Sequence, residues 1–362
     1  MDFDDLKKEF PEDADLKDAE NKQRLNLSEQ AYSVLLRDMD QFLSKPSHQA
    51  GLGSTIINQV FRRYREDAEA SVVLSCRRKK ASLEQVLSSM EPAARQTAVA
   101  LLLEEYRQQL KAQIHPLLKE KGRPIYVRVS MDNMIFLKNT DPELWAFYRK
   151  KPGLYMKALL EEYARKSTVE RERIFFQEII RQICEGMEID VILLLHRRNG
   201  SSTYIKPYKL LEDIDHQHLY LAGYISDKET GPWYPGSTRI STVTSCQILP
   251  RRNLLSGEQV SKLETAIAKY GVQFLSDDPE KTETIQVRFT PSGEKMFHRV
   301  LHLRPNLESY DPQTRTGTFL CTFSQAEFYF MRFAGQAKIL SPEKLAKHMH
   351  KAYTAAAEQY KQ

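Results

Sequence analysis

The stretch IDVILLLHRRNG at residues 189–200 marks the point where the sequence changes from helical to strand periodicity. Its apolar run reads as a strand, and Asn199-Gly200 is a strong signal for a hairpin turn. Three segments rich in strand formers follow: STYIKPYKLL at 202–211, HLYLAGYI at 218–225 and STRISTVTSCQIL at 237–249. Several short strands separated by turns predict a small β-barrel in the middle of the chain.

Before this stretch, one pattern occurs twice. The first copy reads RLNLSEQAYSVLL at 24–36 and GLGSTIINQVFRRY at 51–64; the second reads YVRVSMDNMIFLK at 126–138 and KPGLYMKALLEEY at 151–163. Each copy predicts a short alternating strand followed by two helices. The second helices share one apolar stripe, and Ser54 is the expected N-cap of the first of them.

Strand, helix, helix is the order of a ribbon-helix-helix unit, which both copies resemble. Alternation predicts four inward side chains, which are Leu25, Leu27, Val127 and Val129. The outward side chains could enter a major groove, and they are Arg24, Asn26, Tyr126 and Arg128. The two strands can pair within one chain or between chains. A helical scaffold that only maintains the fold is the alternative.

A charged helical connector separates the two copies. Its four adjacent bases, Arg77, Arg78, Lys79 and Lys80, suit phosphate contacts, although a solvated charge run has the same composition. The capping-box pattern at 82–85 predicts that a helix begins at Ser82. After the second copy, we expect one connecting helix at 169–185 that ends near Gly186.

The C-terminal region turns helical at Ser256, which begins a capping box, and Gly271 is the expected stop of that helix. From about Glu283, strands and helices alternate in a compact α+β pattern, with helix starts predicted at Ser324 and at Pro342. The aromatic residues of this module form either an ordinary core or a surface shared by two chains; they are Phe328, Tyr329, Phe330 and Phe333.

The chain carries a formal net charge of +5. Residues 1–20 hold nine acidic residues and three lysines, so the rest of the chain is more basic than this total. A basic body favours a polyanionic partner, although solubility also accounts for a modest charge.

Several classes of function lack a sequence signal. No apolar run approaches the roughly 18 residues that cross a bilayer, and no secretory signal is visible. The four cysteines are far apart without a CxxC pair, which predicts free thiols and a cytoplasmic location. No phosphate loop, HExxH or GxSxG motif occurs, so we expect no enzyme activity, no cofactor and no metal.

The stretch 190–249 resembles the WYL domain of bacterial regulators, which is an SH3- or Sm-like barrel. The matching residues are Tyr204-Ile-Lys206-Pro207-Tyr208, Leu219-Tyr220-Leu221, Gly223 and Arg239-Ile240. Leu219 stands where the name motif has tryptophan. AEFYFMRFAGQAKILSPEKL at 326–345 resembles the extension that follows many WYL domains.

The whole arrangement is similar to the WYL accessory proteins of type VI-D CRISPR-Cas loci, most of all at KPGLYMKALLEEYARKSTVERERIFFQEII, residues 151–180. This resemblance implies a homodimer that binds single-stranded RNA and stimulates an RNA-guided effector RNase. The family pocket could instead hold a small nucleotide effector.

Cations and aromatic rings gather in the predicted barrel, where bases can stack while cations hold phosphates. The candidate residues are His196, Arg197, Arg198, Tyr204, Lys206, Tyr208, Tyr220 and Arg239. The rival is a ligand-responsive regulator that binds duplex DNA through the ribbon, and a third class is a protein-only adaptor. An open outward side of the ribbon would favour DNA, and a buried ribbon would favour RNA at the barrel.

The predicted fold class is therefore α+β, with two ribbon-helix-helix-like repeats, a central barrel and a C-terminal dimerisation module. We expect five segments. They are 1–122 (acidic arm, first repeat and helical connector), 123–185 (second repeat and connecting helix), 186–250 (WYL barrel), 251–282 (helical linker) and 283–362 (C-terminal extension).

Overall fold

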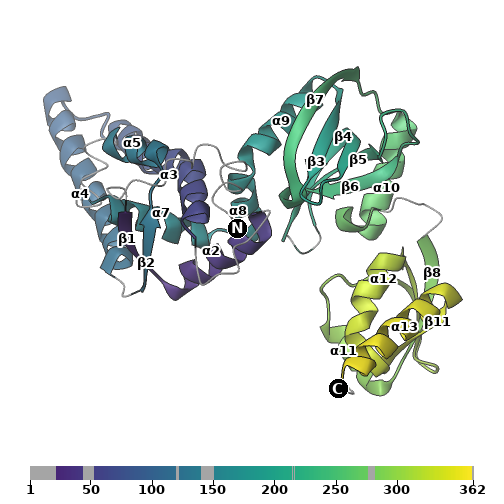
Figure 1. Ribbon diagram of the computed structural model, residues 1–362. Coiled ribbons are helices and arrows are strands. Elements are labelled where there is room, and N and C mark those ends of the chain that lie inside the picture. Colours follow the sequence, from purple (N-terminus) through teal and green to yellow (C-terminus); the bar gives the residue numbers. More distant parts are fainter. Residues whose placement is uncertain are drawn as a thin grey trace. The chain divides into compact units, whose positions relative to one another are not determined.

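The computed structural model describes residues 22–43, 53–119, 122–139, 151–213, 215, 217–275 and 282–360, so the acidic arm lies outside the described residues. The fold class is α+β, and the described strands form three antiparallel sheets. The chain divides into two compact units, Met1–Gln177 and Glu178–Gln362 (Figure 1). The division into five segments remains a prediction.

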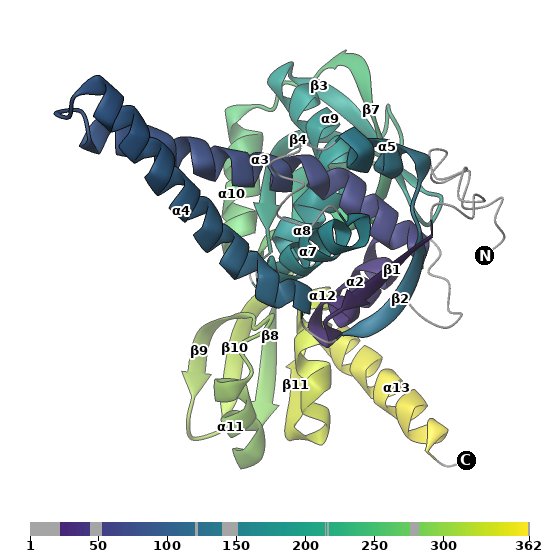
Figure 2. The same cartoon turned by 90° about the vertical axis from the view of Figure 1, so that its left-hand side faces the viewer.

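The first unit is built around a two-stranded ribbon. Its elements are β1 (Lys22–Leu27), α2 (Glu29–Phe42), α3 (Ser54–Val86), α4 (Pro92–Lys119), β2 (Arg123–Arg128), α5 (Met131–Asn139), α7 (Pro152–Arg165) and α8 (Thr168–Phe175). Strands β1 and β2 pair antiparallel within this chain (Figure 2). Among the described residues, a strand is followed by two helices in both segments, and the ribbon-helix-helix-like repeat remains a prediction.

Each of the two segments supports the other at the junction between its strand and its first helix. Asn58 on α3 accepts a hydrogen bond of 2.9 Å from the backbone N–H of Ser130. In return, Glu161 on α7 accepts bonds of 2.7 Å from both the backbone N–H and the hydroxyl of Ser28. These bonds join residues 72 and 133 positions apart in the chain, so the two segments form one folded unit.

The predicted inward face of the ribbon is confirmed, because its four side chains are fully buried: Leu25, Leu27, Val127 and Val129. A buried ion pair lies among the helices of this unit, where Arg171 Nε is 2.8 Å from Asp38 Oδ2. The Tyr163 hydroxyl donates to the same carboxylate oxygen at 2.8 Å. Burial raises the pKa of Tyr163 well above its usual value, so this hydroxyl remains a donor.

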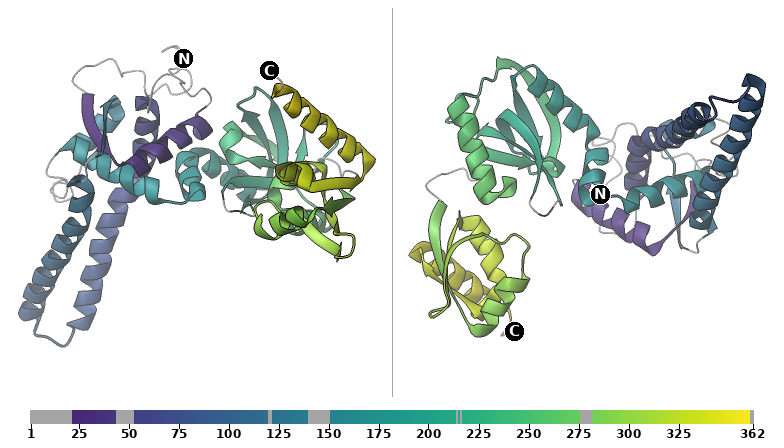
Figure 3. Two further views of the ribbon diagram at one scale, coloured as in Figure 1. Left: turned by 90° about the horizontal axis from the view of Figure 1, so that it is seen from below. Right: turned by 180° about the vertical axis from the view of Figure 1, so that it is seen from behind.

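Helices α3 and α4 form a long hairpin that extends away from the rest of this unit (Figure 3). The prediction of a helix start at Ser82 is wrong, since α3 continues from Ser54 to Val86 with no glycine or proline to interrupt it. Gly53 occupies the N-cap position predicted for Ser54. The Ser54 hydroxyl instead accepts a bond of 3.1 Å from the Arg128 backbone N–H.

The connection from the ribbon unit to the next sheet along the chain also differs from the prediction, which was a single helix ending near Gly186. Two helices are present, α8 and α9 (Gln177–Glu188), and Gly186 lies inside α9. A β-carbon on Gly186 would come within 2.4 Å of Leu193 Cδ2, so the glycine serves close packing rather than a helix stop.

In the second unit, the central region forms a five-stranded sheet of order β6-β5-β4-β3-β7. Its strands are β3 (Val191–Arg197), β4 (Ser202–Glu212), β5 (Leu219–Ser226), β6 (Tyr234–Arg239) and β7 (Val243–Arg252). Among the described residues β6 and β7 are the two edges without a ladder between them, so the predicted closed barrel is not confirmed. The hairpin at Asn199-Gly200 is present, with Gly200 at φ 82°.

One helix covers part of this sheet. Helix α10 (Gly257–Tyr270) begins with the predicted capping box at Ser256 and ends at Gly271, where φ is 80°. Its Leu263 is fully buried against the sheet residues Ala222 and Tyr224. The short helix η4 (Val272–Phe274) continues this cover.

The C-terminal module contains a four-stranded sheet of order β11-β8-β10-β9. Its elements are β8 (Thr282–Phe289), α11 (Pro291–Arg299), β9 (Asn306–Asp311), β10 (Thr316–Thr322), α12 (Phe323–Phe330), η6 (Met331–Gln336), β11 (Ala337–Ser341) and α13 (Glu343–Gln359). Helix α12 is capped by Thr322, two residues before the predicted Ser324, and α13 has Pro342 at its N-cap.

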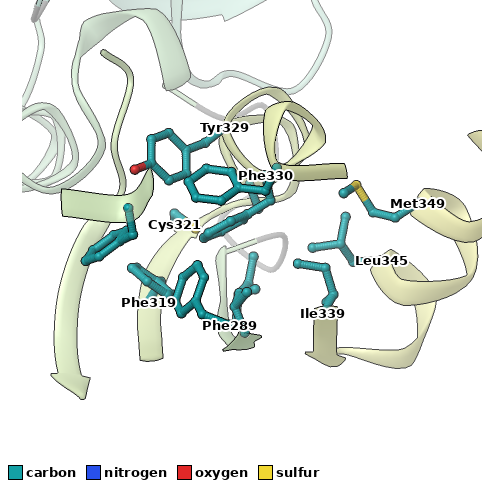
Figure 4. Packing of buried hydrophobic residues seen from close by; sticks show 13 residues of the cluster. Phe289, Phe319, Cys321, Tyr329, Phe330, Ile339, Leu345 and Met349 are labelled. Atoms are coloured by element: carbon teal, nitrogen blue, oxygen red, sulfur yellow. The ribbon is translucent and has the colours of Figure 1, made fainter. Parts of the chain in front are cut away.

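The aromatic residues of this module form a packed core (Figure 4). Tyr329, Phe330 and Phe333 are buried, and their rings contact each other at centroid distances of 5.0–5.9 Å. Phe328 is different, since 62% of it is exposed. Of the four aromatics that could have been shared between chains, only Phe328 is available at the surface.

Candidate nucleic-acid interface

The outward face of the ribbon is open. All four predicted outward residues are exposed, namely Arg24, Asn26, Tyr126 and Arg128. Lys22, which the sequence reading missed, lies on the same face because it pairs with Arg128, just as Arg24 pairs with Tyr126. Extending the strand alternation by two residues would have found it. Three cations and one aromatic ring thus lie together on this face.

A second group of candidates shares the outer face of strands β3 and β4. His196 pairs with Ser202, and Tyr204 and Lys206 alternate with buried neighbours, so the three candidate side chains lie on the same side of the sheet. His196 Nδ1 is 2.8 Å from the Ser202 hydroxyl. Lys206 Nζ lies 4.8 Å from the ring centroid of Trp233, a residue with no signal in the sequence because it comes from a distant loop.

Two predicted stacking residues are instead engaged by the covering helix. Tyr208 and Tyr220 pack at the edge of the cluster formed by Leu263 and the sheet. The Tyr208 hydroxyl donates to Glu264 Oε1 at 2.7 Å, and this bond raises the pKa of Tyr208. The two rings therefore serve to attach α10.

The three predicted arginines of the sheet are not on one surface. Arg197 lies on the inner face, where its Nη2 donates to the Thr238 hydroxyl at 2.9 Å. Arg198 follows the end of β3, and its backbone N–H donates to the Thr242 carbonyl. Arg239 pairs with Tyr220 on the outer face, near His218. Burial, followed by the charge of Arg239, lowers the pKa of His218 to about 4.

The basic cluster of residues 77–80 lies on the hairpin, in the half of α3 that is largely exposed. Lys79 Nζ is 5.7 Å from the Tyr106 ring centroid on α4, and Lys80 Nζ is 3.9 Å from Glu84. Lys80 also lines a groove between the two helices together with Arg95 and Arg107 of α4. The structure places this cluster apart from the ribbon strands, on a separate arm of the same unit.

Groups suited to covalent or metal chemistry are sparse in the described part of the chain. Burial raises the pKa of Cys246 and of Cys321 to about 12, so both thiols are protonated at neutral pH. No group of three histidine, cysteine or acidic side chains is close enough to hold a metal there. Within the same residues, every helix is too short or too polar to span a membrane.

Comparison with known proteins concerns the fold. No protein-family model and no curated protein matches the sequence. A solved structure described as "Crystal structure of a CRISPR Cas-related protein" is similar with a TM-score of 0.67 and 20% identity, over 94% of each chain. Proteasome accessory factor B/C (PafBC) of Arthrobacter aurescens gives a TM-score of 0.28 at 16% identity, over 67% of this chain and 37% of that one. The chain thus shares its fold, over nearly its full length, with a CRISPR Cas-related protein.

Proposed function

We propose that this chain is a non-catalytic accessory protein that binds single-stranded RNA and enhances an RNA-guided RNase of a type VI-D CRISPR system. The observation that carries the proposal is the shared outer face of His196, Tyr204 and Lys206, where two rings and one cation lie on the same side of paired strands. This combination suits unpaired bases and their phosphates. The fold shared with a CRISPR Cas-related protein supports the biological setting.

In this mechanism the protein makes and breaks no covalent bond. The Tyr204 ring stacks on an unpaired base while Lys206 neutralises a phosphate, and a homodimer presents the bound strand to the effector nuclease. Phe328 supports a dimer contact in the C-terminal module, because a large exposed aromatic side chain is typical of protein interfaces.

The first test is fluorescence anisotropy at fixed, near-physiological salt with a single-stranded RNA, its duplex, and double-stranded DNA. We expect the single strand to bind most tightly. The triple variant His196→Ala, Tyr204→Ala, Lys206→Ala should bind it more weakly, whereas Lys262→Ala, on the exposed side of α10, should not change binding. An unchanged affinity in the triple variant would remove the site from this sheet.

The second test measures cleavage of target RNA by a purified type VI-D effector with and without the chain. The proposal predicts faster cleavage with the wild-type chain and a smaller increase with the triple variant. A chain that binds the effector but none of the three nucleic acids would point to a protein-only adaptor.

One observation favours a second candidate, a regulator that binds duplex DNA. The ribbon face is open, and a two-stranded β-ribbon fits the major groove, where Arg24, Asn26 and Arg128 could reach base edges. The anisotropy experiment would favour this candidate if the chain preferred duplex DNA. Arg24→Ala should then lose that preference, and the triple variant of the sheet should keep it.

A further inference from the structure

We infer that the ribbon is a stacking platform for an unpaired nucleobase, centred on Tyr126, rather than a reader of a DNA groove. The inference rests on the proposed function in so far as both name single-stranded nucleic acid as the partner. It places a contact with that strand in the first unit, on a residue that is independent of the outer face of the β3–β4 sheet.

Tyr126 occupies an open position in the middle of the ribbon face. The residue lies within β2 opposite Arg24, and 61% of its surface is exposed. The adjacent pair on the same face is Lys22 with Arg128. A single large ring therefore lies open to solvent among three cations. Burying this ring against a partner would remove its apolar surface from water.

The ring is also held in place. Lys22 Nζ lies 5.0 Å from its centroid, within the range of a cation–π contact. The backbone of β2 is fixed from behind, since the Arg128 N–H donates to the Ser54 hydroxyl and the Arg128 carbonyl accepts from Asn58 Nδ2 at 2.8 Å. The neighbouring Val127 is fully buried beneath the ribbon. Because the ring is positioned before binding, little conformational entropy is lost when a base stacks on it.

The chemistry of this face favours a single strand over a duplex. In a duplex each base is already stacked on both sides and presents only its edges in the grooves. A tyrosine ring gains most from the flat side of a base, which only an unpaired base offers. The cations at Lys22, Arg24 and Arg128 can neutralise the phosphates on either side of that base.

The test uses the full-length chain with short oligouridine and with an abasic ribose-phosphate strand of the same length. Tyr126→Leu should weaken oligouridine binding by about 5- to 150-fold, the range that corresponds to one base–aromatic stack. Tyr126→Phe, which keeps the ring, should retain wild-type affinity. Tyr360→Leu is the matched control, because Tyr360 is an exposed tyrosine of the other unit and has no part in the proposed site.

Two readouts separate stacking from a general loss of charge or structure. The abasic strand should bind wild type and Tyr126→Leu equally, since it has no base to stack. The dependence of affinity on salt should be unchanged in Tyr126→Leu, whereas Arg24→Gln should reduce the slope by roughly 0.7, the value for one phosphate contact with a single strand.

Wild-type affinity of Tyr126→Leu for oligouridine would overturn the inference, and so would an equal loss of affinity for the abasic strand. If the triple variant of the sheet loses binding while Tyr126→Leu does not, the proposed function stands and this inference fails. If Tyr126→Leu weakens only duplex DNA, the ribbon is a groove reader.

Discussion

The ribbon and the five-stranded sheet present similar residues on paired strands, yet they differ in how many of these side chains are available. On the ribbon, Arg24 and Tyr126 lie on an open face. On the sheet, Tyr208 is bonded to Glu264 of α10, and Arg197 is bonded to Thr238 of β6. The same residue types thus all lie open in one region, whereas in the other only His196, Tyr204 and Lys206 remain for a ligand and the rest stabilise the fold.

Cations and aromatic rings therefore indicate a binding face only where no other element of the unit covers them. Helix α10 packs on the sheet through Leu263, whereas the helices of the first unit pack on the inner side of the ribbon. Changes to the residues that support or form the two surfaces should therefore affect stability and binding to different extents.

The largest effect is expected from the buried ion pair of the first unit. Asp38→Ala removes the partner of Arg171 and leaves a guanidinium that is only 3% exposed, at a cost of about 3–5 kcal/mol of unfolding free energy. Urea unfolding followed by circular dichroism measures it. Glu343→Ala, in an exposed pair with Lys347, is the control and should stay within about 0.5 kcal/mol. If both variants lost the same amount of unfolding free energy, this ion pair would not stabilise the unit that contains the ribbon.

The next largest loss of stability is expected at one of two adjacent residues that lie on opposite sides of β1. Leu25→Ala removes a fully buried side chain beneath the ribbon and should cost about 2–5 kcal/mol. Arg24→Ala changes an exposed neighbour and should alter the stability by no more than about 0.5 kcal/mol while it weakens nucleic-acid binding. A large loss of stability in Arg24→Ala would mean that the outer face is structural, as it is around Tyr208.

A smaller effect is expected at the sheet. Tyr208→Phe removes the bond to Glu264, which lies at the surface and should contribute about 1 kcal/mol or less. The midpoint temperature of thermal unfolding should be slightly lower, and the affinity for single-stranded RNA should not change. If RNA affinity falls while stability does not, Tyr208 is available to the ligand and the contrast between the two surfaces is wrong.

The smallest effect at neutral pH is expected at His218, because its contribution changes only as the solution becomes acidic. Burial lowers the pKa of His218 to about 4, with a further contribution from Arg239 that Asp213 opposes. In the unfolded chain a histidine binds a proton near pH 6.5, so the unfolded state gains protons first and the folded state loses stability as the pH falls from about 6.5 towards 4. His218→Gln should make the melting temperature less dependent on pH in this window. An unchanged pH profile would show that His218 is more accessible than the structure indicates.

Much of the ribbon could be predicted from the sequence, because strand alternation is a local property. The inward residues such as Leu25 and Val127, and the outward Arg24 and Tyr126, follow from a period of two alone. The hairpin at Gly200 and the caps at Ser256 and Gly271 were equally readable, because turns and caps depend on a few neighbouring residues.

The candidate site on the sheet could be predicted only in part. The alternation of the strands correctly indicates that one face is shared by His196, Tyr204 and Lys206. Arg197 lies on the opposite face of β3. Trp233 could not be found, because it reaches Lys206 from a distant loop. The prediction of a helix start at Ser82 was wrong because a local capping pattern can also occur in the interior of a continuous helix.

Sequence patterns alone predict where the strands, turns and most helices lie and which side of each strand is apolar, because these properties depend on residues close together in the chain. Three further features became known from the folded structure: β1 pairs with β2, α10 covers the tyrosines of the sheet, and the ribbon face is open. The physical reason is that the pairing of strands and the covering of faces depend on packing between segments far apart in sequence, and no local pattern records which distant segment will bury a given face.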